Sequence, residues 1–212
     1  FKELLRRDDI DAVDVCVHNN KHAPITIAAL EAGKHVYCEK PMAGTYRDAE
    51  AMFKAAAKAK RKLSIQMTTL FSPESRAAKR LIDDGQLGKL YYARSFGYRR
   101  RGRPFVDGYG TANFVDKSIC ADGALFDMGI YHIANILFLV GNPKVLTVTG
   151  ATHQELDMYE ERRKFSNFSV EEMGLGWVRL EGGISFDIEE TWAVHHDGQE
   201  ASKVLGSKGG IK

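Results

Sequence analysis

Asp127 and Tyr131 lie four positions apart in a mostly apolar stretch, a spacing that puts both on one helical face. The stretch covers residues 124–140 and predicts a buried helix, in which positions four apart lie on one side. A carboxylate in so apolar a helix is costly unless it is paired or used, because desolvation disfavours its charged form. Asp127 is therefore a candidate site residue; a cap or structural hydrogen bond at the helix start is the alternative.

Lys40 is the candidate cation. It follows a short apolar run at residues 35–38, which predicts a buried strand, and open parallel sheets bind ligands at the carboxyl ends of their strands. A cation at that place can stabilise an alkoxide as negative charge develops on it. The alternative is a solvent-exposed lysine before the turn residue Pro41. Glu39, its other neighbour, is a candidate carboxylate for the same site.

Tyr131 and His132 are alternative proton acceptors beside Asp127. A free phenol has a pKa of about 10, so Tyr131 needs a nearby cation such as Lys40 to act at neutral pH. An imidazole, with an unperturbed pKa of about 6.5, is the better intrinsic base. His132, however, points roughly 100° further round the helix. A core or substrate-binding histidine is the other interpretation of that residue.

The elements around these residues predict two kinds of sheet. Strand patterns at residues 12–17, 35–38 and 62–69 alternate with helical patterns from 22 and from 45, which is typical of parallel βαβ units. Later strand patterns, at 89–98, 145–152, 174–180, 184–194 and 204–205, mostly follow one another without helices and predict a largely antiparallel sheet. We expect an α/β unit over residues 1–70 and an α+β unit over 71–212, with helices on one face of the second sheet.

Composition excludes several classes of protein. The 212 residues carry a net charge of only +2, and no stretch is apolar enough to span a bilayer, so we expect neither nucleic acid nor membrane as a partner. The one basic cluster, residues 99–103, is interpreted as a solvated loop or subunit contact. Three well-separated cysteines without a C-x-x-C pair favour a reducing, cytoplasmic location. His18 and His22 lack a third ligand, as do His195 and His196, so no metal site is expected.

Three segments, taken in order, resemble the Gfo/Idh/MocA family of NAD(P)-dependent sugar and cyclitol oxidoreductases. The segment at residues 9–22 is similar to the family's strand followed by T-P-N-x-x-H, with Val17-His18 in place of Thr-Pro. Residues 29–41 match the E-K-P motif with its preceding helix and strand. Residues 123–132 are similar to the D-x-G-x-H helix of the second domain. The likeness covers nearly the whole chain.

The resemblance implies the chemistry of an NAD- or NADP-dependent dehydrogenase acting on a sugar-like alcohol. It implies that Lys40 polarises the substrate hydroxyl and that Asn19, His22 and Glu39 lie beside the cofactor. The family's usual catalytic histidine corresponds to Tyr131, a residue that some branches carry there, so Tyr131 is preferred over His132. It also implies a homo-oligomer formed through the antiparallel sheet, for which Tyr91, Tyr92 and Trp192 are candidate aromatics; Trp177 and Trp192 are otherwise core residues.

The family pattern is incomplete in this chain. No G-x-G-x-x-G phosphate loop occurs in the 212 residues, and the first segment corresponds to the family's fourth strand, so we expect a fragment of a longer protein. Two other functions stay open. One is a glycoside-cleaving relative that keeps NAD tightly bound and makes no net NADH. The other is a non-catalytic nucleotide-binding sensor, which the presence of both Lys40 and Asp127 disfavours.

Overall fold

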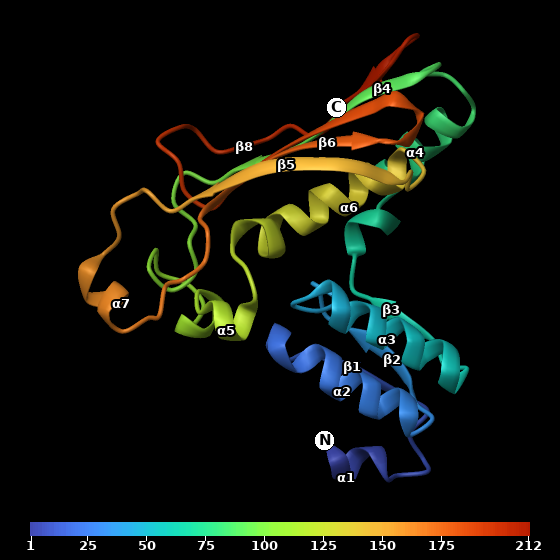
Figure 1. Cartoon of the computed structure of the whole chain (residues 1–212), viewed down its shortest axis with the longest axis vertical. Helices are drawn as coiled ribbons and strands as arrows, with labels where there is room; N and C mark the ends of the chain where they lie inside the picture. The colour runs from blue at the N-terminus through green and yellow to red at the C-terminus, as the bar shows by residue number, and fades with distance from the viewer.

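The computed structural model describes residues 1–212, apart from the side chain of residue 200. Its N-terminal part contains a three-stranded parallel sheet in the order β1-β2-β3 (Figure 1). The strands are β1 (Ala12–Val15), β2 (His35–Cys38) and β3 (Leu63–Ile65), and the crossover helices are α2 (Asn19–Glu31) and α3 (Tyr46–Ala59). The predicted parallel βαβ arrangement is therefore confirmed.

Local sequence signals set the ends of these helices. The Thr45 hydroxyl caps α3 by accepting the backbone N–H of Asp48 at 3.1 Å, as the Thr-x-x-Asp spacing predicts. Gly33 has a φ of +77°, a conformation that suits glycine, and it lies just after the end of α2. The core between the helices and the sheet is apolar, with Leu30, Val36 and Met52 buried. Strand β2 is thereby fixed, and the residues that follow it emerge at its carboxyl end.

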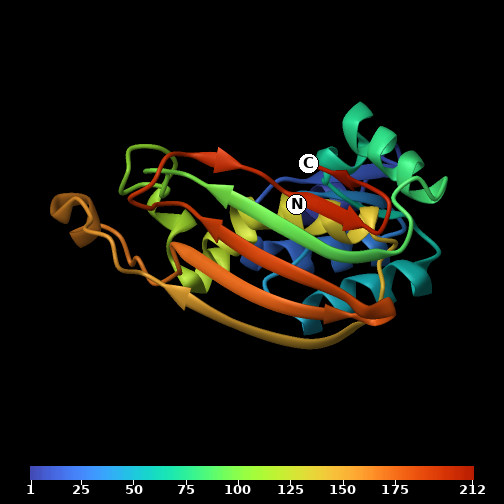
Figure 2. The same cartoon turned by 90° about the horizontal axis from the view of Figure 1, so that it is seen from above.

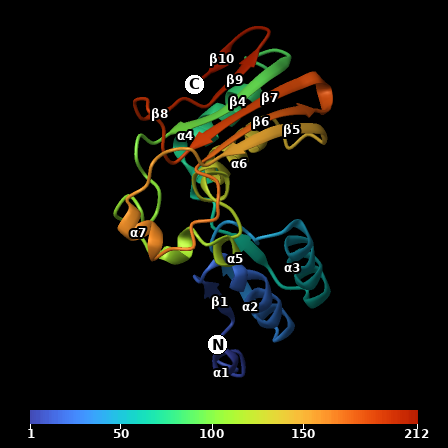
Figure 3. The ribbon, with the colours of Figure 1, turned by 60° about the vertical axis from the view of Figure 1, so that its left-hand side comes forward.

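The second sheet has seven strands, of which six form the order β10-β9-β4-β7-β6-β5 while β8 pairs with β4 (Figure 3). They are β4 (Leu90–Tyr98), β5 (Val145–His153), β6 (Met173–Leu180), β7 (Ile184–Thr191), β8 (Gln199–Glu200), β9 (Lys203–Gly206) and β10 (Gly210–Ile211). The central pair β4 and β7 is parallel, and the other pairs are antiparallel. The predicted mostly antiparallel sheet is confirmed, with one parallel pair that the sequence pattern did not indicate.

Helices cover one face of this sheet, and the opposite face carries none of the described helices (Figures 1 and 2). Helix α6 (Ile130–Leu139) packs on the covered face, where Ile136, Phe186 and Val178 belong to one buried cluster. The remaining helices are α1 (Lys2–Leu5), α4 (Pro73–Asp83), α5 (Lys117–Cys120) and α7 (Glu160–Lys164), with short turns η1 (Thr68–Phe71), η2 (Ala112–Phe114), η3 (Leu125–Gly129) and η4 (Glu181–Gly183). No helix among the described residues is long and apolar enough to cross a membrane.

The predicted helix over residues 124–140 is present, but it is not α-helical throughout. Its first part, η3 (Leu125–Gly129), is a π-helix that leads directly into α6. A π-turn accommodates an extra residue and often occurs at functional sites. Glu171 holds the entrance of this turn, since its carboxylate accepts the backbone N–H groups of Gly123 at 2.7 Å and Leu125 at 3.0 Å. Asp127 lies in the middle of the π-turn.

Candidate active site

Lys40 and Asp127 form an ion pair that joins the two parts of the chain. The Lys40 ammonium donates to the backbone carbonyl of Asp127 at 2.7 Å and to its Oδ1 at 3.0 Å. The lysine side chain is 12% exposed and the aspartate side chain 31%, so the pair is accessible at one edge. Lys40 follows β2 and Asp127 belongs to η3. The structure therefore brings together two predicted site residues that are 87 positions apart.

The second carboxylate oxygen of Asp127 has partners from the ends of β4 and β7. The Trp192 indole N–H donates to Oδ2 at 3.0 Å, and the Arg99 guanidinium lies 3.9 Å from the same oxygen. Since β4 and β7 are parallel neighbours, residues that follow them leave the sheet at one edge. Trp192 is buried, as predicted for a core residue, but it also contacts the site. An indole N–H requires such a partner when buried, and the sequence pattern does not indicate which one.

Tyr131 and His132 leave their helix in different directions. The Lys40 ammonium lies 4.7 Å from the centroid of the Tyr131 ring. His132 instead faces the sheet, where its Nδ1 lies 2.9 Å from Oε2 of the fully buried Glu190. The geometry places Tyr131, and not the Nδ1 edge of His132, against the site lysine. A carboxylate on Nδ1 fixes the orientation of the imidazole, so Glu190 is a partner that sequence reasoning missed.

A cavity of about 280 Å3 lies beside the Lys40–Asp127 pair. Its walls come from both parts of the chain and comprise Val17, His18, Asn19, Glu39, Lys40, Pro41, Phe114, Cys120, Asp122, Phe126, Asp127 and Trp192. The predicted residues Asn19 and Glu39 are in this lining. Asn19 also ties the walls together, because its amide donates to the Cys120 carbonyl at 2.6 Å. The cavity therefore lies at the carboxyl ends of β1 and β2, next to the candidate catalytic residues.

His22 is the one predicted cofactor residue that does not line this cavity. It is fully buried, and its Nδ1 and Nε2 lie 2.8 Å from the Pro41 carbonyl and 3.0 Å from the Val17 carbonyl. Both of its polar atoms thus have backbone partners. The structure places His22 beneath the loops that carry the site.

Cys120, the thiol that lines the cavity, is not an activated nucleophile. Burial raises the pKa of Cys120 to about 12 and that of Cys38 to about 11. A thiol is a nucleophile only as the thiolate, so both are protonated and inert at neutral pH. Among the described residues, no group of three or more His, Cys, Asp and Glu side chains could hold a metal ion.

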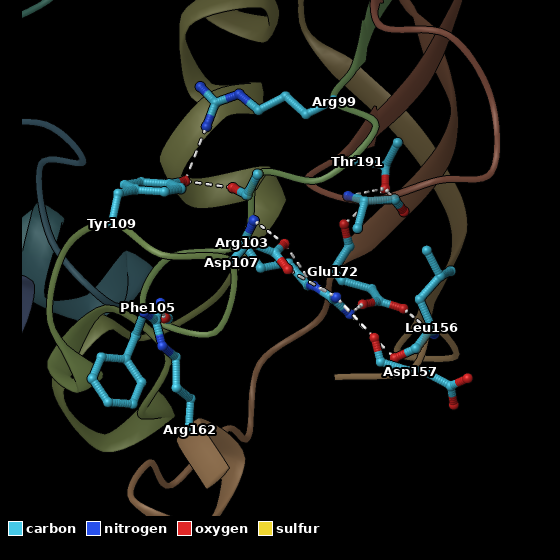
Figure 4. A network of polar contacts seen from close by, with 12 residues as sticks. Arg99, Arg103, Phe105, Asp107, Tyr109, Leu156, Asp157, Arg162, Glu172 and Thr191 are labelled. Atoms are coloured by element: carbon cyan, nitrogen blue, oxygen red, sulfur yellow. Dashed lines mark hydrogen bonds and ion pairs between the residues drawn. The ribbon is translucent and has the colours of Figure 1, made fainter. Parts of the chain in front are cut away.

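The basic cluster at residues 99–103 is not uniformly solvated, which corrects the prediction for Arg103. Its guanidinium is fully buried and bonds to Asp107, to Glu172 and to the carbonyls of residues 156 and 157 (Figure 4). A loop has no regular alternation of apolar and polar residues, so its sequence does not indicate that the Arg103 side chain is buried. The network anchors the loop that follows β4, and Arg99 at the start of that loop donates to the Tyr109 hydroxyl at 3.3 Å.

The cavity fits one end of a dinucleotide. Open parallel sheets bind nucleotides at their carboxyl edge, and here that edge offers Asn19, Glu39 and Lys40 as polar groups with Phe126 as an apolar one. Those residues could hold a nicotinamide ring and its ribose next to Asp127. The 212 residues contain no glycine-rich loop of the type that cradles a pyrophosphate.

A parallel α/β unit and a mostly antiparallel α+β unit thus share one lysine–carboxylate site. Family models place the chain more narrowly. Residues 1–67 match the model described as oxidoreductase family, NAD-binding Rossmann fold, and residues 75–212 match the GFO/IDH/MocA C-terminal domain. The chain belongs to the GFO/IDH/MocA family.

Individual relatives are consistent with this assignment. The chain is 30% identical to D-glucoside 3-dehydrogenase of Escherichia coli K12, covering 94% of this chain and 58% of that protein. It is 34% identical to levoglucosan dehydrogenase of Pseudarthrobacter phenanthrenivorans, covering 66% of this chain and 36% of that protein. The chain thus spans little more than half the length of the first of these relatives and about a third of the second.

Solved structures of similar proteins superpose on almost the whole chain. An oxidoreductase domain protein from Kribbella flavida has a TM-score of 0.84 at 31% identity, covering 99% of this chain and 56% of that one. Levoglucosan dehydrogenase in complex with NADH and levoglucosan has a TM-score of 0.86 at 25% identity, covering 99% and 55%. The two-part architecture is therefore that of known oxidoreductases.

Proposed function

We propose that the protein transfers a hydride reversibly between a sugar-like secondary alcohol and NAD or NADP. The observation that carries this proposal is the Lys40–Asp127 pair beside a cavity at the carboxyl edge of a parallel sheet. A hexose, cyclitol or glycoside is the proposed substrate class. Support for that class comes from relatives named for glucosides, levoglucosan and scyllo-inositol.

Each site residue then has a distinct task. Lys40 donates a hydrogen bond to the substrate hydroxyl oxygen and stabilises negative charge as it develops there. Asp127 holds the ammonium in place through its Oδ1 and its backbone carbonyl. The Tyr131 ring lies against the Lys40 ammonium, and its oxygen, as the phenolate, takes the hydroxyl proton and becomes the neutral phenol. A bound nicotinamide dinucleotide supplies the hydride acceptor.

The two parts of the chain divide the work in this proposal. Residues 1–70 form the cofactor side, with Asn19 and Glu39 as contacts, and residues 71–212 form the substrate side. Support comes from the cavity, whose lining draws on both parts. We also propose a cytoplasmic location, which the three free cysteines favour.

A substrate panel tests the activity. We expect NADH or NADPH to form with at least one hexose, cyclitol or glycoside, and Lys40→Met to lower kcat on the order of 10²- to 10⁴-fold. Lys54→Met is the matched control, because Lys54 is also ion-paired, to Glu50 at 2.9 Å, but lies exposed on α3. Equal activity of Lys40→Met and wild type would remove Lys40 from the reaction.

A pair of variants tests the choice of proton acceptor. Tyr131→Phe removes the phenol and should lower kcat on the order of 10²-fold or more. His132→Gln removes a side chain that faces Glu190, so we expect a smaller loss of kcat and a clear loss of stability. The reverse order of the two effects on kcat would assign the role to His132.

We further propose that the sheet face without helices forms a homo-oligomer interface. Trp177 is 47% exposed on this face, and its ring lies 6.5 Å from that of Tyr92 on β4. Exposed apolar groups of this kind are typical of protein interfaces. Trp192, a predicted member of this face, is buried at the site instead. Light scattering should show an oligomer that Trp177→Glu dissociates, whereas Phe53→Glu on α3 leaves it intact; a wild-type monomer would contradict the proposal.

A further inference from the structure

His22 lies between the two loops that follow β1 and β2 on the cofactor side, and it contacts both of them. The loop after β1 begins near Val17, and the loop after β2 contains Glu39, Lys40 and Pro41. The imidazole lies between them, with Nε2 3.0 Å from the Val17 carbonyl and Nδ1 2.8 Å from the Pro41 carbonyl. One side chain therefore bridges both loops whose residues line the cavity.

The chemistry of the two partners determines what the ring must do. A carbonyl oxygen can only accept a hydrogen bond, so a ring nitrogen that bonds to one donates its N–H. The tautomer of His22 sets which carbonyl, that of Val17 or that of Pro41, receives this bond, and the other carbonyl lies against the opposite edge of the ring. His22 is fully buried, so no water competes with the ring for these carbonyls. The Pro41 loop carries one cation, Lys40, and one carboxylate, Glu39.

We propose that His22 is a positioning residue of the active site: its ring bridges the Val17 and Pro41 carbonyls and thereby holds Lys40 on Asp127. The contact with Pro41 acts on the residue directly after Lys40, while the contact with Val17 fixes the opposite side of the ring to the loop after β1. The loop that carries Lys40 is thereby held in place, and the Lys40 ammonium lies 3.0 Å from Oδ1 of Asp127. The expected effect on kcat rests on the proposed function, whereas the positioning of Lys40 does not.

The first test is spectroscopic and needs no activity. In protein labelled with ¹⁵N-histidine, a ring N–H of His22 should exchange slowly with solvent, because the ring is fully buried and lies against two backbone carbonyls. The His22 signals are identified by their absence from His22→Phe, or from His22→Gln if the phenylalanine variant does not fold. A His22 ring N–H that exchanges as fast as that of a solvent-exposed histidine would overturn the bridge.

The second test asks whether the bridge positions Lys40. His22→Phe should shift the Lys40 side-chain ammonium resonance and lower kcat about tenfold to a hundredfold, because a displacement of about 1 Å in a catalytic group has that effect. His22→Gln, whose side-chain amide has two N–H groups, should partly restore both the Lys40 resonance and kcat. An unchanged Lys40 resonance in folded His22→Phe would overturn the positioning role.

His35 provides the matched control. Its Nδ1 accepts the backbone N–H of Lys62 at 2.9 Å, so it too links two segments of the small sheet, but at the start of β2 and away from Lys40. His35→Phe should lose stability while leaving the Lys40 resonance and kcat at wild-type values. Equal effects of the two substitutions on Lys40 would mean general loosening of the sheet and would also overturn the proposal. A lack of dehydrogenase activity in the wild type would refute the proposed function and leave both spectroscopic outcomes decisive.

Discussion

Replacing Arg103 by methionine removes the donor side of the buried ionic network that anchors the loop beside the site. The guanidinium makes five hydrogen bonds, to Oδ2 and Oδ1 of Asp107, Oε2 of Glu172 and two backbone carbonyls. Methionine fills a similar volume but leaves both carboxylates without their cation. Breaking a buried ion pair from one side costs roughly 3–5 kcal/mol. For a chain of this size, that corresponds to a fall in Tm of roughly 6–20 °C.

The same network predicts how this loss depends on pH. The Arg103 bonds hold the pKa of Asp107 below its ordinary value, although burial opposes them. A carboxyl with a lowered folded-state pKa contributes stability above its unfolded value, near about 4, and loses it as pH falls through the folded value. The difference between wild type and Arg103→Met should therefore be largest near neutral pH and shrink in acid.

Denaturant unfolding at several pH values measures both effects. Arg162→Met is the control, since that guanidinium is exposed and makes one bond, to the Phe105 carbonyl at 2.9 Å (Figure 4). We expect it to change the unfolding free energy by less than about 1 kcal/mol. If the unfolding free energy of Arg103→Met is also within about 1 kcal/mol of the wild-type value at neutral pH, the network does not anchor the loop.

The remaining predictions concern the cysteines and the indole. At mildly alkaline pH, iodoacetamide should alkylate Cys16, which is exposed, and leave Cys38 and Cys120 intact, because burial raises their pKa values to about 11 and about 12. Peptide mass mapping reads this directly, and fast labelling of either buried thiol would contradict it. Trp192→Phe keeps an aromatic ring but removes the donor to the site carboxylate, so kcat/KM should fall about tenfold or more. Trp177→Phe is its control and should leave kcat/KM unchanged.

Much of the fold follows from periodicity and local signals. The parallel unit was predictable because its short apolar strands alternate with helices, and Thr45 and Asp48 mark a helix start with a recognisable pair of side chains. The pairing of β4 with β7 was not predictable, because alternation within a strand does not specify its neighbour. The π-turn was also hidden. Apart from Asp127 its residues are apolar or glycine, so the pattern of an ordinary helix fits them equally well.

Site residues were predictable where placing that residue type in its surroundings costs free energy unless it has a partner or a function. Asp127 in an apolar helix and Lys40 at a strand end both met that condition, and they are in contact. Trp192 and Arg103 did not meet it. A tryptophan in a strand is ordinarily a core residue, and an arginine in a glycine-containing loop is ordinarily solvated, so only long-range packing shows what each one bonds to.

Hydride transfer from a deuterated substrate tests the central claim most directly. A sugar or cyclitol that turns over in the panel is labelled with deuterium on the carbon that is oxidised, and the reduced cofactor is analysed by mass spectrometry. We predict that the deuterium appears in the cofactor with the wild type and with Lys54→Met, and that its appearance slows on the order of 10²-fold or more with Lys40→Met. A cofactor without deuterium, or equal rates with Lys40→Met and wild type, would contradict the proposed role of the Lys40–Asp127 site.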